Sequence, residues 1–428
     1  MEVDGSETAS AVNSRGVYDR IDGSKTGQKL TSYDNSAVNW GAVASSAWYE
    51  VIKRDFVAGE YVWTGFDYIG EPTPWNGTGK GAQGTWPSPK NSYFGIIDTA
   101  GFPKDSYYFY QSQWNDEVNT LHILPAWNED AVKKDSSGKV PVVVYTDAKK
   151  VELFFTDAKT GDKKSLGTKE FTQKQSNTQG YTYQYYEGTD KSGTEHKNLY
   201  LTWQVPYKAG TISAVAYGQD GQKISEEKLN GRTSVTTTGE KKNLKATVDR
   251  DTIAADGADL TYVTVDVTDK DGNIIPNAED KVSFKVEGEG KLVGIDNGRQ
   301  DDHTSYQANS RNAFAGKVLA IVQSTKKAGS FTVTASAKGL ETSSVTVTTT
   351  SVEQDTTGEK AISYYEMSKN YYVKTGNMPQ LPSTVKAVYT DGSEKEIPVT
   401  WDAITEEQIA QSGTFSVAGT TEAEILLQ

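Results

Sequence analysis

The sequence predicts a multidomain protein in which an α/β segment comes first and β-sandwich domains follow. The 428 residues are too many for one ordinary hydrophobic core and suggest three or four domains. Apolar residues recur at helical spacing only before about residue 116. After that point the chain consists of short β-forming runs separated by Gly, Asp and Lys. We therefore expect the C-terminal part of an α/β barrel followed by immunoglobulin-like sandwiches.

The first 115 residues alternate helical and extended patterns. Apolar residues from Ala37 to Asp55 follow a helical period, and the run Glu60–Phe66 is rich in β-forming residues, which predicts a buried strand. A loop rich in Gly, Pro and Trp spans 70–89, and the aromatic run Ser106–Trp114 predicts a second helix. Helix, strand, long loop and helix are typical of a (β/α)8 TIM barrel, to which we assign residues 1–115.

Three β units are expected after the barrel segment. Residues 116–236 are predicted to form the β-sandwich that follows the barrel, and residues 237–350 an immunoglobulin-like domain. Residues 356–428 are predicted to form a smaller immunoglobulin-like domain, which is incomplete because no clear final strand is visible. The strands on which these assignments depend are Val142–Tyr145, Val151–Phe155, Leu199–Trp203, Ile212–Tyr217, alternating Val263, Val265 and Val267, and a hairpin of Val385–Tyr389 with Ile397–Trp401.

The composition excludes several classes of function. The formal net charge is −13, and such a polyanion is not attracted to nucleic acid or to an anionic membrane surface. The chain has no Cys and three scattered His, so we expect no transition-metal site, no cysteine nucleophile and no cofactor. No apolar run is long enough to span a bilayer and no export signal is visible, so membrane insertion is not expected and any signal would lie outside this chain.

The candidate chemistry lies in the barrel segment. Glu7 stands between small residues, where such a fold places catalytic groups at the mouth of a strand, although an isolated Glu is usually a solvated surface residue. Trp63 would lie at the top of the next strand, where an indole face can pack against the apolar face of a galactose ring. Asp67 and Glu71 follow closely and could bind sugar hydroxyls.

Three motifs resemble the β-galactosidases of glycoside hydrolase family 2, in particular the multidomain enzymes of bacterial cell surfaces. These motifs are Gly5–Ser10, Gly59–Pro72 and Gly95–Lys104, and they are specific in combination. Further along, Leu121–Asn128 is similar to the sandwich after the barrel in those enzymes, and residues 240–350 are similar to their invasin-like immunoglobulin domain. The resemblance implies a hydrolase that acts on carbohydrate and is secreted or attached to the cell wall.

The resemblance also implies roles for single residues. Glu7 would be the catalytic nucleophile of a retaining glycosidase, which uses two carboxyl groups about 5–5.5 Å apart. Trp63 would line the galactose subsite, and Asp67 and Glu71 would contact the sugar. The remaining candidates are two tryptophans that either form the floor of the aglycone site or fasten their own loop, Trp75 and Trp86.

The implied reaction releases terminal β-linked galactose from oligosaccharides or glycans through a covalent glycosyl-enzyme. In the family, the general acid/base is a Glu of an earlier barrel strand, for which this chain has no counterpart. We therefore expect the isolated chain to be an inactive fragment, with a poorly ordered first segment and independently folding sandwiches. The β-glucuronidases and β-mannosidases of the family share the mechanism, and the stretch Trp63–Pro72 favours galactose by resemblance. The sequence does not indicate the oligomeric state.

Two other interpretations stay open at this point. The sandwiches could form a non-enzymatic surface spacer or a carbohydrate-binding module, with a platform of Tyr181, Tyr183, Tyr185 and Tyr186. The period of two in these tyrosines instead favours ordinary strand packing. The acidic loop Asp296–Asp302 could bind Ca²⁺ or Na⁺ through oxygen ligands, although a solvated turn is the simpler interpretation.

Overall fold

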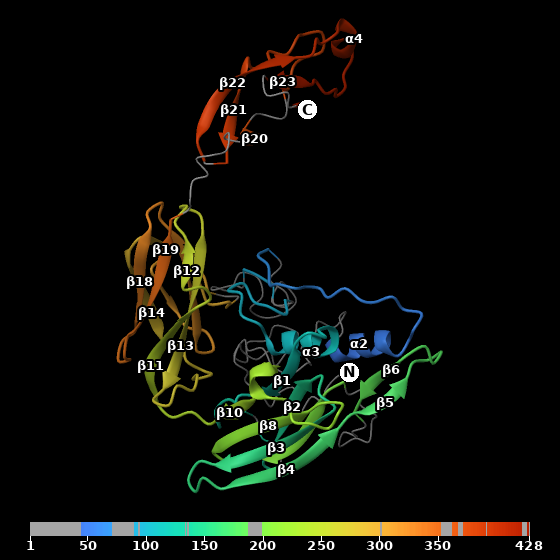
Figure 1. Cartoon of the computed structure of the whole chain (residues 1–428), viewed down its shortest axis with the longest axis vertical. Helices are drawn as coiled ribbons and strands as arrows, with labels where there is room; N and C mark the ends of the chain where they lie inside the picture. Colours follow the sequence, from blue (N-terminus) through green and yellow to red (C-terminus); the bar gives the residue numbers. More distant parts are fainter. Residues whose placement is uncertain are drawn as a thin grey trace, which may run out of the picture. The chain divides into compact units, whose positions relative to one another are not determined.

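The chain forms two compact units, which are described separately (Figure 1). The first extends to Ser351 and the second comprises the residues beyond it. No helix in the described part is long and apolar enough to cross a membrane. The computed structural model describes residues 44–70, 90–92, 95–132, 134, 137–186, 199–299, 302–351, 362–366, 371–390, 392–421 and 426–427.

Two helices, one short parallel pairing and two isolated antiparallel bridges are the regular elements in the described part of the first 115 residues. Helix α2 (Ala44–Ile52) lies inside the expected helical stretch, and α3 (Asp105–Trp114) matches the expected aromatic helix. The buried strand expected at Glu60–Phe66 is wrong, because Tyr61 is fully exposed and Phe66 is 59% exposed. Its end pairs with residues 95–97, and Val62 packs against the aromatic cluster around Phe109. The barrel itself is not shown by these residues and stays a proposal.

The first sandwich comprises residues 119–236. One sheet has the strand order β7-β2-β1-β9, and the other has the order β10-β8-β3-β4. A small third sheet pairs β5 with β6, and a 3₁₀ turn, η1 (Glu226–Lys228), precedes β9. The strands are β1 (Asn119–Leu124), β2 (Lys139–Thr146), β3 (Lys150–Asp157), β4 (Lys163–Glu170), β5 (Thr172–Gln175), β6 (Thr182–Tyr185), β7 (Leu201–Pro206), β8 (Gly210–Tyr217), β9 (Leu229–Asn230) and β10 (Ser234–Thr236).

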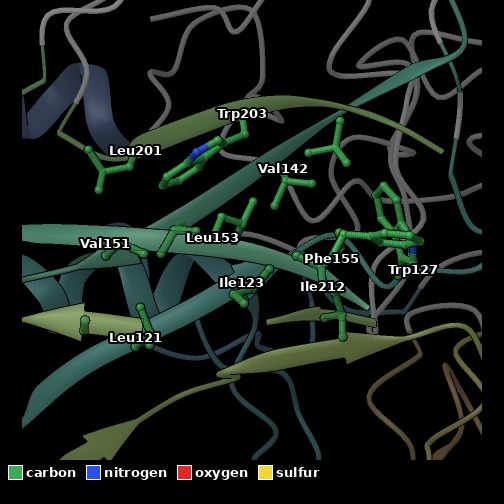
Figure 2. Close-up of a cluster of buried hydrophobic side chains, with 14 of the residues drawn as sticks. Leu121, Ile123, Trp127, Val142, Val151, Leu153, Phe155, Leu201, Trp203 and Ile212 are labelled. Atoms are coloured by element: carbon green, nitrogen blue, oxygen red, sulfur yellow. The ribbon is translucent and has the colours of Figure 1, made fainter. Parts of the chain in front are cut away.

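The core of this sandwich lies between its two large sheets. Strand β3 alternates buried and half-buried positions, so that Val151, Leu153 and Phe155 all point inward (Figure 2). Trp203 of β7 and Ile212 of β8 pack against them from the two sheets. The strands expected in this region are confirmed. β3 and β7 alternate with a period of two, whereas β2 is buried on both faces.

The second sandwich comprises residues 241–350. Its sheets have the orders β11-β13-β17-β15 and β12-β19-β18-β14-β16. The inward alternation expected at Val263, Val265 and Val267 is confirmed, since all three are fully buried. The strands are β11 (Lys241–Val248), β12 (Thr252–Ala254), β13 (Leu260–Asp269), β14 (Lys281–Gly288), β15 (Gly290–Asp296), β16 (Ser310–Asn312), β17 (Lys317–Ser324), β18 (Gly329–Ser336) and β19 (Ser343–Thr350).

The second compact unit contains one five-stranded sheet in its described residues. The strand order is β20-β21-β22-β23-β24, and neighbouring strands are antiparallel. The hairpin expected near Asp391-Gly392 is confirmed as β21 and β22. The elements are β20 (Ile362–Glu366), β21 (Thr384–Tyr389), β22 (Glu394–Trp401), α4 (Glu406–Ile409), β23 (Gly419–Thr421) and β24 (Leu426–Leu427).

A shared aromatic core joins the helices to the first sandwich. Phe109 and Tyr110 of α3 pack against Tyr145 of β2, and Tyr183 and Tyr185 of β6 belong to the same buried cluster. Both tyrosines are less than 10% exposed, which confirms strand packing rather than a sugar platform at these positions. The mainly β, sandwich-type architecture expected after residue 115 is therefore confirmed, while the four domain boundaries stay predictions.

Candidate functional site

The candidate site is built on two segments that run parallel to each other. The amides of Ile96 and Ile97 donate to the carbonyls of Thr64 and Gly65 at 3.1 and 3.0 Å, and the Asp67 amide donates to the Ile97 carbonyl at 2.8 Å. Position 95 must be Gly, because a Cβ there would lie 2.0 Å from the Asp67 nitrogen. The pairing therefore places residues 64–67 directly beside residues 95–97, and residues 68–70 pair with residues 90–92.

Asp67 is buried between these segments. Its carboxylate accepts hydrogen bonds from the Gly95 amide at 2.8 Å and from the Lys104 ammonium group at 2.9 Å. Burial raises the pKa of Asp67 to about 6, because the loss of hydration outweighs the attraction of Lys104. The carboxylate is thus engaged inside the protein, and the expected contact between Asp67 and a sugar stays a prediction.

A tight turn brings Lys104 back to Asp67. The Asp98 carboxylate accepts hydrogen bonds from the amides of Ala100 and Phe102 at 2.9 and 3.0 Å, which closes the turn. The Lys104 amide then donates to the Ile96 carbonyl at 2.8 Å. Sequence reasoning missed the roles of Asp98 and Lys104, since the only local signal is an acidic residue before a Gly-containing turn and a Lys after a Pro.

Trp63 lies at the exposed end of the same pairing. Its side chain is 72% exposed, and its indole Nε1 donates a hydrogen bond to the Tyr68 hydroxyl at 3.1 Å. The two rings meet edge to face, with 6.3 Å between centroids. The indole orientation is therefore held from one side, while much of its surface faces solvent. This arrangement suits stacking against the apolar face of a sugar ring.

The other sequence-predicted site residues lie outside the described residues. These are Glu7, Glu71, Trp75 and Trp86. Of the six candidates, the structure therefore locates Trp63 and Asp67, which lie four residues apart on one loop. Trp63 contacts Tyr68 of this loop, and Asp67 binds Lys104. The separation between Glu7 and these residues stays open to experiment.

A buried charged cluster lies just behind this loop. Asp105, the residue after Lys104, accepts hydrogen bonds from His122 Nε2 and, at 3.1 Å, from Arg232. The Arg232 amide donates to His122 Nδ1 at 3.2 Å, so this ring nitrogen carries no proton. Burial, together with the charge of Arg232, lowers the pKa of His122 to about 4. Burial alone would raise the pKa of Asp105, but Arg232 and His122 outweigh it and lower this pKa.

The acidic loop considered as a cation site is bound by an arginine of β16. Arg311 is fully buried, and its guanidinium group binds the carboxylate of Asp296 and lies 3.6 Å from that of Asp302. Asn297 also donates to Asp302 at 2.6 Å. These contacts supply the positive charge that a bound cation would bring. In the described part of the chain, no cluster of three or more His, Cys, Asp or Glu residues could hold a metal ion.

Three family models match the chain. Residues 244–346 match glycoside hydrolase family 2 C-terminal domain 5, and residues 366–424 match the bacterial Ig-like domain, group 4. Residues 137–225 match a domain of unknown function, DUF4982. The domain 5 match covers most of the second sandwich. The Ig-like match falls within the second compact unit, and the DUF4982 match falls within the first sandwich.

The curated relatives of this chain carry the names of glycosidases. The chain is 35% identical over 310 residues to "Beta-galactosidase BoGH2A" of Bacteroides ovatus, in an alignment covering 72% of this chain and 30% of that protein. It is 33% identical over 290 residues to "Putative beta-glucuronidase" of Formosa agariphila, covering 67% and 23%. A crystal structure of a β-glycosidase from Bacteroides vulgatus is similar with a TM-score of 0.57 and 28% identity, covering 75% of this chain and 34% of that chain.

The alignments cover less than a third of either curated relative, since they span 30% of the first and 23% of the second. The domain 5 match, the Ig-like match and the relatives agree with one another and with the motifs around Trp63 and Lys104. The chain is therefore identified as part of a glycoside hydrolase family 2 protein, including its C-terminal domain 5.

Proposed function

We propose that the whole protein is a retaining glycosidase that releases terminal β-linked galactose from oligosaccharides or glycans. The observation that supports this most directly is the exposed indole of Trp63, held by Tyr68 at the end of the parallel pairing. The named activity of the Bacteroides ovatus relative agrees with it. In this proposal, Trp63 packs against the galactose ring, and Glu71, Trp75 and Trp86 contact the sugar or the aglycone.

The proposed reaction has two steps. Glu7 attacks the anomeric carbon and forms a glycosyl-enzyme, while a second carboxyl group protonates the departing oxygen. The same carboxyl group, supplied by another part of the protein, then removes a proton from the water that releases galactose. Asp67 and Lys104 pair with each other and hold the loop that carries Trp63 against residues 95–97.

The choice between galactoside and glucuronide depends on charge at the sugar C6 position. A glucuronide carries a carboxylate there, which is best recognised by a basic side chain that has no other partner. Of the two basic residues that the structure describes at this pairing, Lys104 is bound to Asp67 and the Lys90 ammonium group lies over the Tyr306 ring. This arrangement favours the uncharged galactose ring. The relative named as a β-glucuronidase makes the comparison necessary.

The test compares aryl β-galactosides with aryl β-glucuronides, using the whole protein and its Glu7→Gln variant. We expect faster hydrolysis of the galactoside and loss of turnover in the variant, because the glycosyl-enzyme can no longer form. An activated 2-deoxy-2-fluorogalactoside should label the peptide that contains Glu7, as measured by mass spectrometry. The matched control is Glu240→Gln, at an exposed glutamate just before β11.

Two results would contradict the proposal. Preferred hydrolysis of the glucuronide would overturn the proposed substrate, and labelling of a carboxylate other than Glu7 would overturn the proposed nucleophile.

We also propose that the protein acts outside the cell or at its surface. Protease treatment of intact cells checks this location, because a cytosolic protein would stay uncleaved.

A further inference from the structure

Strand β17 of the second sandwich carries apolar residues on both of its faces. Val318, Ala320 and Val322 point into the core of the sandwich and are fully buried. Leu319 and Ile321 alternate with them and therefore lie on the opposite face of the sheet. In an isolated sandwich that face would meet water, yet Leu319 is only 5% exposed.

The cover over Leu319 is the turn that leads to Lys104. Ala100 and Phe102 form a buried cluster with Leu319, and Ile321 packs against its edge. The Lys317 ammonium group lies 5.6 Å from the centre of the Phe102 ring and is bound to Asp266 at 2.6 Å. Phe102 is two residues before Lys104, so this contact fixes the turn that presents Lys104 to Asp67.

A second contact joins the same sandwich to the other end of the paired segments. The Lys90 ammonium group lies 4.3 Å from the centre of the Tyr306 ring, and the Lys90 carbonyl accepts a hydrogen bond from the Gly70 amide at 3.1 Å. The buried Arg311 guanidinium lies 4.9 Å from the same Tyr306 ring. Gly70 and Lys90 flank the stretch of sequence that carries Glu71, Trp75 and Trp86.

We infer that the second sandwich is a fixed part of the candidate sugar site, in which Leu319 and Tyr306 are positioning residues. Leu319 acts through Phe102 and Lys104 on Asp67, and Tyr306 acts through Lys90 on Gly70. The two contacts hold both ends of the segment pair whose exposed edge carries Trp63. The structural part of this inference stands on the contacts alone, and its consequence for sugar binding rests on the proposed function.

The test uses Leu319→Thr in the full chain, because Thr keeps the strand preference and removes most of the apolar contact. Hydrogen–deuterium exchange should rise by a factor of about 5 to 30 in peptides covering 95–104 and 64–70, as expected for the loss of one local contact of ordinary size. Peptides covering 331–336 of the sandwich core should exchange as before. Calorimetry with a non-hydrolysable alkyl β-thiogalactoside should show weaker binding by a similar factor.

Three further variants make the result specific. Leu319→Met should restore both exchange and binding, since Met fills the same space. Lys285→Thr changes an exposed residue of β14, in the other sheet of the sandwich, and should change neither. Phe102→Leu weakens the same contact from the side of the turn. If Leu319→Thr unfolds the sandwich, exchange and sugar binding of Phe102→Leu are measured in its place.

Unchanged exchange at 95–104 in folded Leu319→Thr and Phe102→Leu would overturn the inference, as would an equal effect of Lys285→Thr. If the wild-type chain does not bind the thiogalactoside, the proposal that this chain binds galactose is contradicted. The exchange measurement then still decides whether the second sandwich positions the loop.

Discussion

At the scale of single residues, Lys104 and Asp105 are neighbours in the chain whose side chains bind different groups of residues. Lys104 binds Asp67 in the candidate site, whereas Asp105 binds His122 and Arg232 behind it. Tyr108 stacks on the His122 ring with 3.9 Å between centroids. Because both charged groups are buried and paired, the start of α3 has little freedom to move.

The neutral state of His122 makes stability depend on pH. Its pKa is about 4 in the folded chain and about 6.5 when unfolded, so only the unfolded state binds a proton between these values. The free energy of unfolding should therefore fall as pH falls from 6.5 toward 4, by about 2 kcal/mol between pH 7.5 and pH 5. The lowered pKa of Asp105 acts in the same direction at lower pH.

Urea denaturation at pH 7.5 and pH 5 measures this effect. In His122→Gln the loss between the two values should largely disappear, because Gln can replace both hydrogen bonds but does not titrate. His303→Gln, at an exposed histidine, is the control and should retain the loss. An equal loss in the wild type and in His122→Gln would show that another group is responsible.

At the scale of elements, the hairpin of β5 and β6 extends from the first sandwich to the end of α2. The Asp55 carboxylate accepts hydrogen bonds from Thr178, from Ser176 at 2.7 Å and from the Gly180 amide at 3.0 Å. These bonds, led by the one from Thr178, lower the pKa of Asp55 to about 2. The Tyr181 hydroxyl also donates to the Ile52 carbonyl at 2.7 Å. One acidic residue thus collects most of the polar contacts between the hairpin tip and the helix.

Replacing Asp55 should release this hairpin tip. In Asp55→Ala we expect faster hydrogen exchange and faster proteolytic cleavage at residues 176–181, because the Ser176, Thr178 and Gly180 donors lose their shared acceptor. Asp55→Asn should give an intermediate effect, since it keeps one acceptor oxygen. The control is Asp220→Ala, which removes a turn carboxylate elsewhere in the first sandwich. Equal cleavage of Asp55→Ala and the wild type would show that packing alone holds the tip.

At the scale of the whole molecule, the first sandwich is not closed by its own residues. The aromatic core shared with α2 and α3 includes the fully buried Phe109, Tyr145 and Leu124. The sandwich therefore uses the helices to cover one face of its β7-β2-β1-β9 sheet. We therefore expect the first sandwich to be less stable without α2 and α3, because the face that they cover would expose apolar side chains to water.

A chain that begins at residue 116 tests this dependence. Removing the helices exposes several large side chains, each worth about 1.5–3 kcal/mol when buried, so the loss approaches the whole stability of a typical domain. We expect a lower urea midpoint and binding of a hydrophobic dye, compared with the full chain. A chain that ends at Ser351 is the control and should keep its midpoint, because the residues beyond form a separate compact unit. Equal midpoints for all three chains would contradict the shared core.

The sequence by itself determined the local elements and the family. Alternating Val263, Val265 and Val267 and the aromatic run before Trp114 specify strand and helix through their spacing, which depends on near neighbours only. The motifs around Trp63 and Lys104 pointed to glycoside hydrolase family 2, and the family comparisons confirm it. The roles of Glu7, Glu71, Trp75 and Trp86 stay predictions.

Only the tertiary structure decided what these elements touch. The run Glu60–Phe66 has the composition of a buried strand, yet burial depends on neighbours that are distant in sequence, and Tyr61 lies fully exposed. Asp67 is buried against Lys104, which is 37 residues away in the chain, and its expected contact with a sugar stays a prediction. Leu319 has the same local pattern as any strand residue, and only the fold places Phe102 over it. Spacing along the chain specifies local conformation, whereas such long-range contacts arise only when separate segments pack together.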